Sequence, residues 1–229
     1  MTAPAPTPDA AAERSRGLAS GIAAYVIWGF FPLLFPLLKP AGAFEILAHR
    51  IVWSLVAVVI ALVLLRHPWG WLRSALTRER LPRIVAAAFL VGLNWLVFIW
   101  AVNSNHVVEA SLGYFINPLL NIVLGVLLFG ERMSRAGLAG TLLATVGVAV
   151  IAWENWAGLW VSLALALTFG LYGAVKKKAS APPLGGLFLE SAILLPFALA
   201  YWGWLVATGA SHFGTDARTS GLLILAGVL

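Results

Sequence analysis

The sequence predicts an all-α integral membrane protein, built as a polytopic helical bundle. Apolar residues make up 61% of the chain and charged residues only 10%, and the mean hydropathy is +0.93. Soluble domains carry about 25% charged residues. The apolar residues also form separate runs of about 18 to 22, the length at which a helix crosses a hydrocarbon core of about 30 Å.

Seven runs are long enough to span a bilayer, and short segments with polar residues, Pro or Gly, typical of loops, separate them. The predicted spans are residues 17–38, 45–65, 82–101, 109–129, 136–153, 157–175 and 184–208. An eighth run, residues 221–229, is too short to cross, so we expect a fragment or a natural truncation of a longer protein. Residues 1–16, rich in Ala and Pro, are expected to form a disordered cytoplasmic tail.

Most of the 15 Lys and Arg residues fall on one side of these spans if the amino terminus is cytoplasmic. The connections NSNHVV and ENWAG, which lie on the other side, carry none. Cationic loops face the cytoplasm in membrane proteins, so the distribution predicts a cytoplasmic amino terminus. It also accounts for the net charge of +6 through topology and contact with membrane lipid, without nucleic acid.

A weak internal repeat appears when the chain is shifted by 141 residues, which lays His49 over Glu190. Spans one and six then correspond, with five helices in each repeat. An odd number inverts the second copy in the membrane, as in many secondary transporters, whose substrate site lies between the repeats.

The segment EILAHR opens span two with three ionisable residues, Glu45, His49 and Arg50. Glu45 and His49 are four residues apart, so they share a helix face and can pair directly, while Arg50 points about 100° away. Ionisable groups inside a bundle are costly and often mark an ion or substrate pathway. The alternative is that Glu45 lies near the headgroups and that Arg50 snorkels or pairs with a carboxylate.

Polar residues also interrupt spans three and four. Asn94 and Trp95 lie near the middle of span three, where Asn94 needs a partner from another helix or from a substrate. In EASLGYFINPLLN, the polar and small residues of span four share one stripe, which predicts either a cavity lining or a helix–helix interface. The stripe contains Glu109, Gly113, Tyr114, Asn117 and Asn121.

Glu190 is the lone acid of span seven, and its repeat position opposite His49 makes it a candidate for proton coupling or for pairing with Arg50. The sequence contains no HExxH, GxSxG or Walker A motif and no Asp-rich metal motif, which argues against an enzyme or an ATP-driven pump. No cofactor or metal site is predicted.

The ordered set EILAHR, NW, EASLGYFINP and GERMS resembles the RarD branch of the EamA, or drug/metabolite transporter, superfamily. This resemblance implies an inner-membrane carrier of bacteria with inverted five-helix repeats, ten helices in all, at residues 17–153 and 157–229 here, the second one incomplete. It also implies ATP-independent export of small metabolites or drugs by alternating access, and the branch carries a chloramphenicol-sensitivity label. Carried onto this chain, the pathway residues are Glu45, His49, Arg50, Asn94, Trp95, Tyr114 and Asn117, with Glu109 and Glu190 beside them.

Three other hypotheses remain open at the level of sequence. Protonation of Glu45, His49 or Glu190 could couple transport to protons, and a homodimer through span five and later helices is compatible with the pattern. Alternatively, the chain is a non-transporting membrane component that modulates a partner or the response to an antibiotic.

Overall fold

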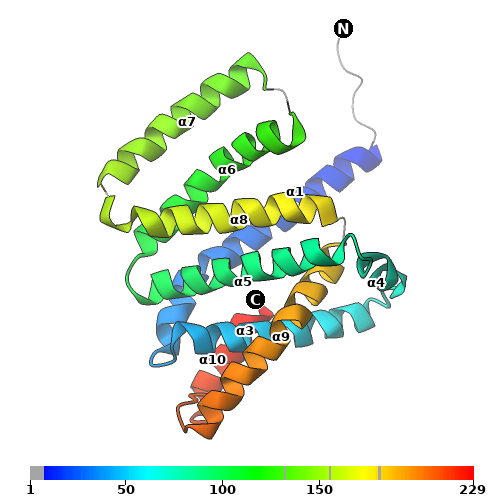
Figure 1. Ribbon diagram of the computed structural model, residues 1–229, viewed down its shortest axis with the longest axis vertical. Helices are drawn as coiled ribbons and strands as arrows, with labels where there is room; N and C mark the ends of the chain where they lie inside the picture. The colour runs from blue at the N-terminus through cyan, green and yellow to red at the C-terminus, as the bar shows by residue number, and fades with distance from the viewer. Residues whose placement is uncertain (1–7, 132, 155, 180–181) are drawn as a thin grey trace.

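The computed structural model describes residues 8–131, 133–154, 156–179 and 182–229, and within these residues it contains helices and no strands. The predicted all-α fold is therefore confirmed (Figure 1). The helical elements are α1 (Pro8–Gly29), α2 (Phe31–Leu34), η1 (Phe35–Leu38), α3 (Ala43–Leu64), α4 (Gly70–Ala75), α5 (Leu81–Asn103), α6 (Val107–Phe129), α7 (Arg135–Glu154), η2 (Trp156–Gly158), α8 (Leu159–Ala179), α9 (Pro183–Ala207) and α10 (Ala217–Val228).

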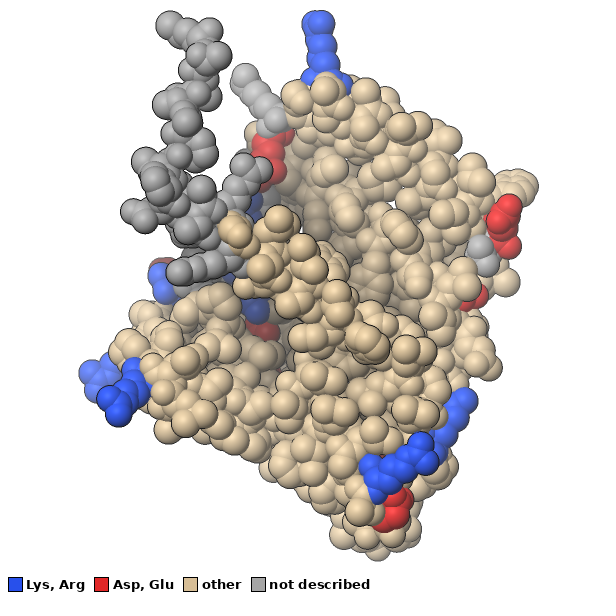
Figure 2. Space-filling model, turned by 180° about the vertical axis from the view of Figure 1, so that it is seen from behind, with Lys and Arg blue, Asp and Glu red and all other residues tan. Residues whose placement is uncertain are grey.

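Seven helical segments of the described chain are long and apolar enough to cross a membrane, which confirms the predicted spans. They are Gly17–Leu38, Ala43–Leu64, Leu81–Asn103, Val107–Leu128, Arg135–Glu154, Trp156–Lys177 and Pro183–Ala207. The eighth apolar helix, α10, is shorter. Figure 2 shows the arrangement expected of such a protein, because most charged side chains on that face lie toward its margins, with a broad uncharged surface between them.

Local sequence explains where several helices begin and end. Pro82 lies in the first turn of α5 and Pro183 in the first turn of α9, where the missing N–H of proline costs nothing. Helix α6 ends at Gly130, which has φ 65° in the left-handed region that glycine adopts without strain. Helix α10 begins at Asp216, whose carboxylate accepts a hydrogen bond from the Thr219 N–H at 2.7 Å.

The expected disordered tail differs from the structure over its second half. Helix α1 begins at Pro8, so residues 8–16 are helical, and residues 1–7 lie outside the described residues. Three consecutive alanines follow Asp9, and alanine has the highest helix propensity. Helix propensity here outweighs the low hydrophobicity on which the expectation of disorder depended.

The bundle is organised around α3, α5 and α8, which run side by side in Figure 1. Helix α3 packs against α9 and α10, α5 packs against α8 and α9, and α6 packs against α8. The largest apolar cluster joins α2, η1, α3, α5 and α10 through Phe31, Phe35, Ile46, Ile99 and Leu223. Helix α7 contacts mainly α6, and none of its described residues is buried.

Candidate functional site

The N-terminal turn of α3 is tied to the segment between α9 and α10 through Glu45. The residue Glu45 is 2% exposed. Its Oε1 accepts a hydrogen bond from the His212 N–H at 2.6 Å, and its Oε2 lies 2.7 Å from the His212 Nδ1. Ser211 donates a longer bond of 3.4 Å to Oε1. Glu45 therefore holds this connecting segment over the end of α3.

Sequence reasoning missed His212. It lies in a polar connection 167 residues from Glu45, and no periodic pattern links the two. One signal could have found it: a buried acid at a helix end requires a partner, and residues 209–216 contain one histidine and no Lys or Arg. The direct pair of Glu45 and His49 that the spacing allowed does not form a hydrogen bond, because the Glu45 oxygens are bonded to residues 211 and 212 and neither His49 nitrogen has a partner within the described residues.

His49 is fully buried between aromatic rings of the same region. Its ring stacks on Phe213 at a centroid distance of 4.8 Å and meets Trp202 edge to face at 4.5 Å. Neither ring nitrogen has a hydrogen-bond partner within the described residues. Phe213 follows His212, so the segment that binds Glu45 also covers His49.

Arg50 occupies an aromatic setting on the adjacent face of α3. The Arg50 Cζ lies 4.3 Å from the centroid of the Phe31 ring and 4.8 Å from that of Trp95. Residue Arg50 is 8% exposed, and Tyr114 is near enough to interact electrostatically with the guanidinium. The structure thus places Arg50 against Phe31 and Trp95 and within electrostatic range of Tyr114.

Of the two partners expected for Asn94, another helix or a substrate, the structure shows another helix. Its side-chain N–H group donates to the Leu165 carbonyl at 3.0 Å and to the Thr168 hydroxyl at 2.9 Å. Both partners belong to α8, and Asn94 is 3% exposed. The residue therefore joins α5 to α8, while the next residue, Trp95, faces Arg50.

The residues of the polar stripe of α6 do not all have the same surroundings. Its Glu109 end packs on α8: the Glu109 carbonyl accepts a bond from Ser162 at 2.6 Å, the Glu109 side chain lies against Gly158, and a Cβ at Gly113 would lie 3.0 Å from Leu165. These positions form a helix–helix interface.

Tyr114 and Asn117 differ from the rest of this stripe. Tyr114 contacts Phe98 of α5 edge to face at 5.7 Å, and 41% of it is exposed. Asn117 is 6% exposed, and its Oδ1 accepts no hydrogen bond from any described residue. The Asn117 Oδ1 is thus a buried acceptor without a donor, and Tyr114 is a partly exposed aromatic residue on the same stripe.

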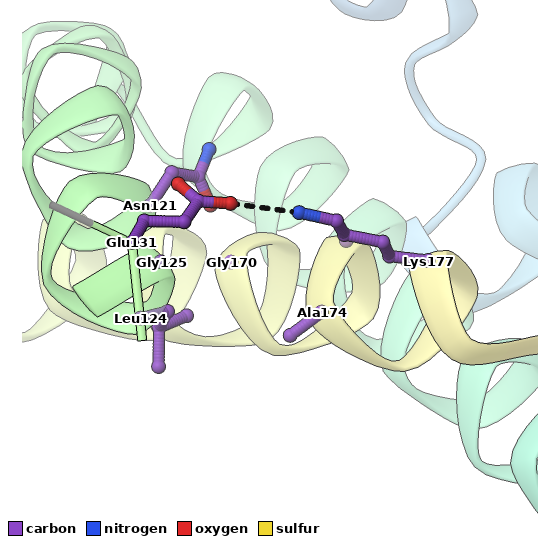
Figure 3. A pocket seen from close by; sticks show the side chains of 8 residues that line it. Asn121, Leu124, Gly125, Glu131, Gly170, Ala174 and Lys177 are labelled. Carbon is purple, nitrogen blue, oxygen red and sulfur yellow. Dashed lines mark hydrogen bonds and ion pairs between the residues drawn. The ribbon is translucent and has the colours of Figure 1, made fainter. Parts of the chain in front are cut away.

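The far end of the stripe opens into a pocket of about 290 Å³ between α6 and α8 (Figure 3). Asn121, Glu131 and Lys177 supply its polar groups, and Gly125 and Gly170 leave room between the helices. An ion pair of 2.9 Å joins Lys177 to Glu131, and both side chains are 57% exposed. This pair links the ends of α6 and α8.

Glu190 pairs with Lys176, and the predicted alternative of pairing with Arg50 is wrong. The Lys176 Nζ lies 3.2 Å from Oε1 of Glu190, and the Tyr172 hydroxyl donates to Oε2 at 3.1 Å. Lys176 also donates to the Tyr172 hydroxyl. Because Lys176 comes from the end of α8, the Lys-rich segment that predicts topology also neutralises a buried acid.

The described residues thus place two buried acids, each paired with a partly exposed base, at opposite ends of the bundle. Glu45 and His212 lie where α3 begins and α9 ends, whereas Glu190 and Lys176 lie where α8 ends and α9 begins. Arg50 belongs to neither pair. No cluster of three or more His, Asp or Glu residues suited to a metal ion occurs in the part of the chain that the structure describes.

Comparison with known proteins gives a consistent result. Residues 15–153 match the model of the EamA-like transporter family. The chain is 48% identical to protein RarD of Streptomyces exfoliatus over 93% of this chain and 68% of that protein. It is 43% identical to an uncharacterized transporter of Pseudomonas aeruginosa over 92% of this chain and 68% of that protein.

A further relative carries a phenotypic name. The chain is 33% identical to the chloramphenicol-sensitive protein RarD of Pseudomonas aeruginosa, over 83% of this chain and 65% of that protein. No solved structure matches the chain.

Proposed function

We propose that this chain, which belongs to the RarD branch of the EamA-like transporter family, is an ATP-independent carrier that exports a small metabolite or drug by alternating access. The solute would bind beside Arg50, Trp95, Tyr114 and Asn117. One observation carries the proposal: a guanidinium is buried within a membrane-spanning bundle, seven residues after the first residue of α3, which is about 10 Å along the helix.

The packing of the helices supports an inverted repeat. If α1 to η1 corresponds to α8, α3 to α9 and α5 to α10, an inverted pair of repeats requires matching contacts. The contact of α5 with α9 is matched by that of α10 with α3, and the contact of α5 with α8 by that of α10 with α2 and η1, whereas the contact of α3 with α5 has no counterpart of similar extent between α9 and α10. The contact of α3 with α9 matches itself, so the proposed axis of the repeats passes between these helices.

The two acid–base pairs fit the ends of an alternating pathway. Opening one end would separate His212 from Glu45, and opening the other would separate Lys176 from Glu190. Each separation exposes a carboxylate to water, where it can exchange a proton. Glu45, Glu190 and the buried His49 are therefore the proposed coupling residues.

The proposed setting is the bacterial inner membrane, with the amino terminus in the cytoplasm and lipid around the apolar faces. Helix α7 has none of its described residues buried, so it is available for lipid or for a second copy of the chain. A homodimer through α7 remains part of the proposal.

Whole-cell export tests this function. Cells expressing the chain are loaded with radiolabelled chloramphenicol, and the composition of their medium is compared with that of cells expressing Arg50→Gln. We expect the wild type to lower chloramphenicol retention or to enrich at least one small solute outside, and Arg50→Gln to abolish the change. Arg78→Gln, at an exposed loop position, is the control.

If neither chloramphenicol nor any solute differs between expressing and empty cells, the carrier function is wrong. A change in antibiotic sensitivity without any change in solute distribution would favour the non-transporting component instead.

A further inference from the structure

Two buried acids of the described spans each have a basic partner. Glu45 pairs with His212, and Glu190 pairs with Lys176. Within the described residues, no side chain or carbonyl forms a hydrogen bond or ion pair with the Arg50 guanidinium, and its Nε is both buried and unpartnered. The structure therefore leaves the buried Arg50 guanidinium without an anionic hydrogen-bond partner.

The surroundings of Arg50 stabilise its charge but do not accept its hydrogen bonds. The rings of Phe31 and Trp95 attract the cation through their π faces. An aromatic face offers no lone pair to the N–H groups in the guanidinium plane, and those donors are costly to leave unpaired in a dry site. The site therefore contains guanidinium N–H donors that have no hydrogen-bond acceptor.

Charge and geometry together define the missing acceptor. A guanidinium binds a carboxylate or a phosphate through two parallel N–H···O bonds. A monoanion neutralises Arg50, whereas a phosphate dianion would leave a net negative charge in the membrane interior, at considerable cost. Of the other acids of the described spans, Glu109 packs against Gly158 and is absent from the electrostatic partners of Arg50, and Glu154 is exposed at the end of α7.

We infer that Arg50 is the anchor for a solute that carries a single carboxylate on an apolar body, with Phe31, Trp95 and Tyr114 around that body. This assignment rests on the carrier function proposed above, because it supplies that site with a substrate class. Tyr114 is two-fifths exposed and interacts electrostatically with Arg50, so we assign it to the side from which the solute reaches the guanidinium.

Calorimetric binding to the full chain in lipid nanodiscs tests the assignment with matched probes. Three acids and their amides have nearly the same shape and differ in charge: benzoate and benzamide, phenylacetate and phenylacetamide, hexanoate and hexanamide. We expect at least one acid to bind about thirtyfold or more tightly than its amide. We also expect phenyl phosphate to bind more weakly than phenylacetate.

Three variants identify the residue responsible. Arg50→Gln should remove the preference for acid over amide. Arg50→Lys keeps the charge but lacks the planar fork, so it should keep the preference at lower affinity. Arg78→Gln, in an exposed loop, should behave as the wild type.

Equal binding of every acid and its amide, tighter binding of phenyl phosphate, or an unchanged preference in Arg50→Gln would each overturn the inference. If Arg50→Gln does not fold, the ratio of acid to amide in the wild type and in Arg50→Lys still decides. Export without any acid preference would contradict the assignment of a carboxylate substrate and leave the carrier function intact. Selective acid binding without export would contradict the carrier function and leave the preference of the site for a carboxylate intact.

Discussion

Glu190 and Lys176 form the buried ion pair whose loss should be easiest to measure. Replacing Glu190 by Gln leaves the Lys176 ammonium without its counter-charge while keeping the size of the side chain. We expect the free energy of unfolding to fall by about 1 to 3 kcal/mol, because Lys176 is 30% exposed and water can partly replace the lost partner. Denaturant unfolding in detergent measures the change.

A second substitution distinguishes the contribution of the ion pair from that of Glu190 alone. Lys176→Met in the Glu190→Gln background removes the stranded charge and should restore part of the lost stability. If the double variant is less stable than Glu190→Gln by the full cost of Lys176→Met alone, the two residues act independently and the ion pair contributes nothing.

Asp216 gives a pH dependence at the start of α10. The hydrogen bond from the Thr219 N–H holds the pKa of the Asp216 carboxyl below its usual value. A carboxyl with a lowered folded pKa stabilises the fold above its unfolded pKa of about 3.9, and this stabilisation is lost as the pH falls through the folded value.

We therefore expect the first turn of α10 to fray as the pH is lowered from 5 toward 3, which hydrogen exchange at the Thr219 amide reports. Asp216→Ala should fray at both pH values and show little pH dependence. Equal acid sensitivity in the wild type and in Asp216→Ala would show that another group is responsible.

At the scale of the elements, Gly227 sets how closely α10 approaches α3. A Cβ at Gly227 would lie 2.5 Å from the Cβ of Trp53 and 3.1 Å from the carbonyl oxygens of His49 and Arg50. Gly227→Val should lift α10 from α3 and cost about 1 to 3 kcal/mol. Gly221→Val is the matched control, since its Cβ would meet nothing within 4 Å.

Protease cleavage between α9 and α10 measures this contact, because His212 and Phe213 lie in that connection. Faster cleavage is expected in Gly227→Val than in Gly221→Val. Equal cleavage rates in the two variants would mean that α10 does not depend on close packing against α3.

The bond network of Asn94 predicts a structural phenotype. Asn94→Leu removes the two hydrogen bonds from α5 to α8, and the Thr168 hydroxyl keeps its bond to the Ala164 carbonyl. We expect a loss of about 0.6 to 1.7 kcal/mol, the range found for hydrogen bonds between membrane helices. Carboxylate preference should be unchanged, and a change in preference would return Asn94 to the pathway.

The whole molecule can be oriented in its membrane because the chain contains no cysteine. Single cysteines at Thr77, between α4 and α5, and at Ala210, between α9 and α10, are exposed and lie at opposite ends of the bundle. A membrane-impermeant thiol reagent should label Ala210→Cys in intact cells and Thr77→Cys only after permeabilisation. The opposite pattern would place the amino terminus outside.

The spans could be predicted from sequence because length and hydropathy alone determine which segments can cross a bilayer. The partners of the buried ionisable residues could not be predicted in the same way. The i, i+4 spacing of Glu45 and His49 allowed a direct pair, but His212 is bonded to Glu45 instead. Glu190 likewise pairs with Lys176 and not with Arg50. Contacts between distant segments depend on helix packing, which local periodicity does not contain.

The bond between Glu45 and His212 also bears on how the protein is made. The two residues are 167 positions apart, so at a synthesis rate of about 5 to 20 residues per second Glu45 waits roughly 8 to 33 s for its partner. Until then, a carboxylate at the start of α3 has no counterpart inside the bundle and is best accommodated in contact with water or lipid headgroups. We therefore expect the N-terminal end of α3 to reach its final depth late in biogenesis, after α9 has been inserted.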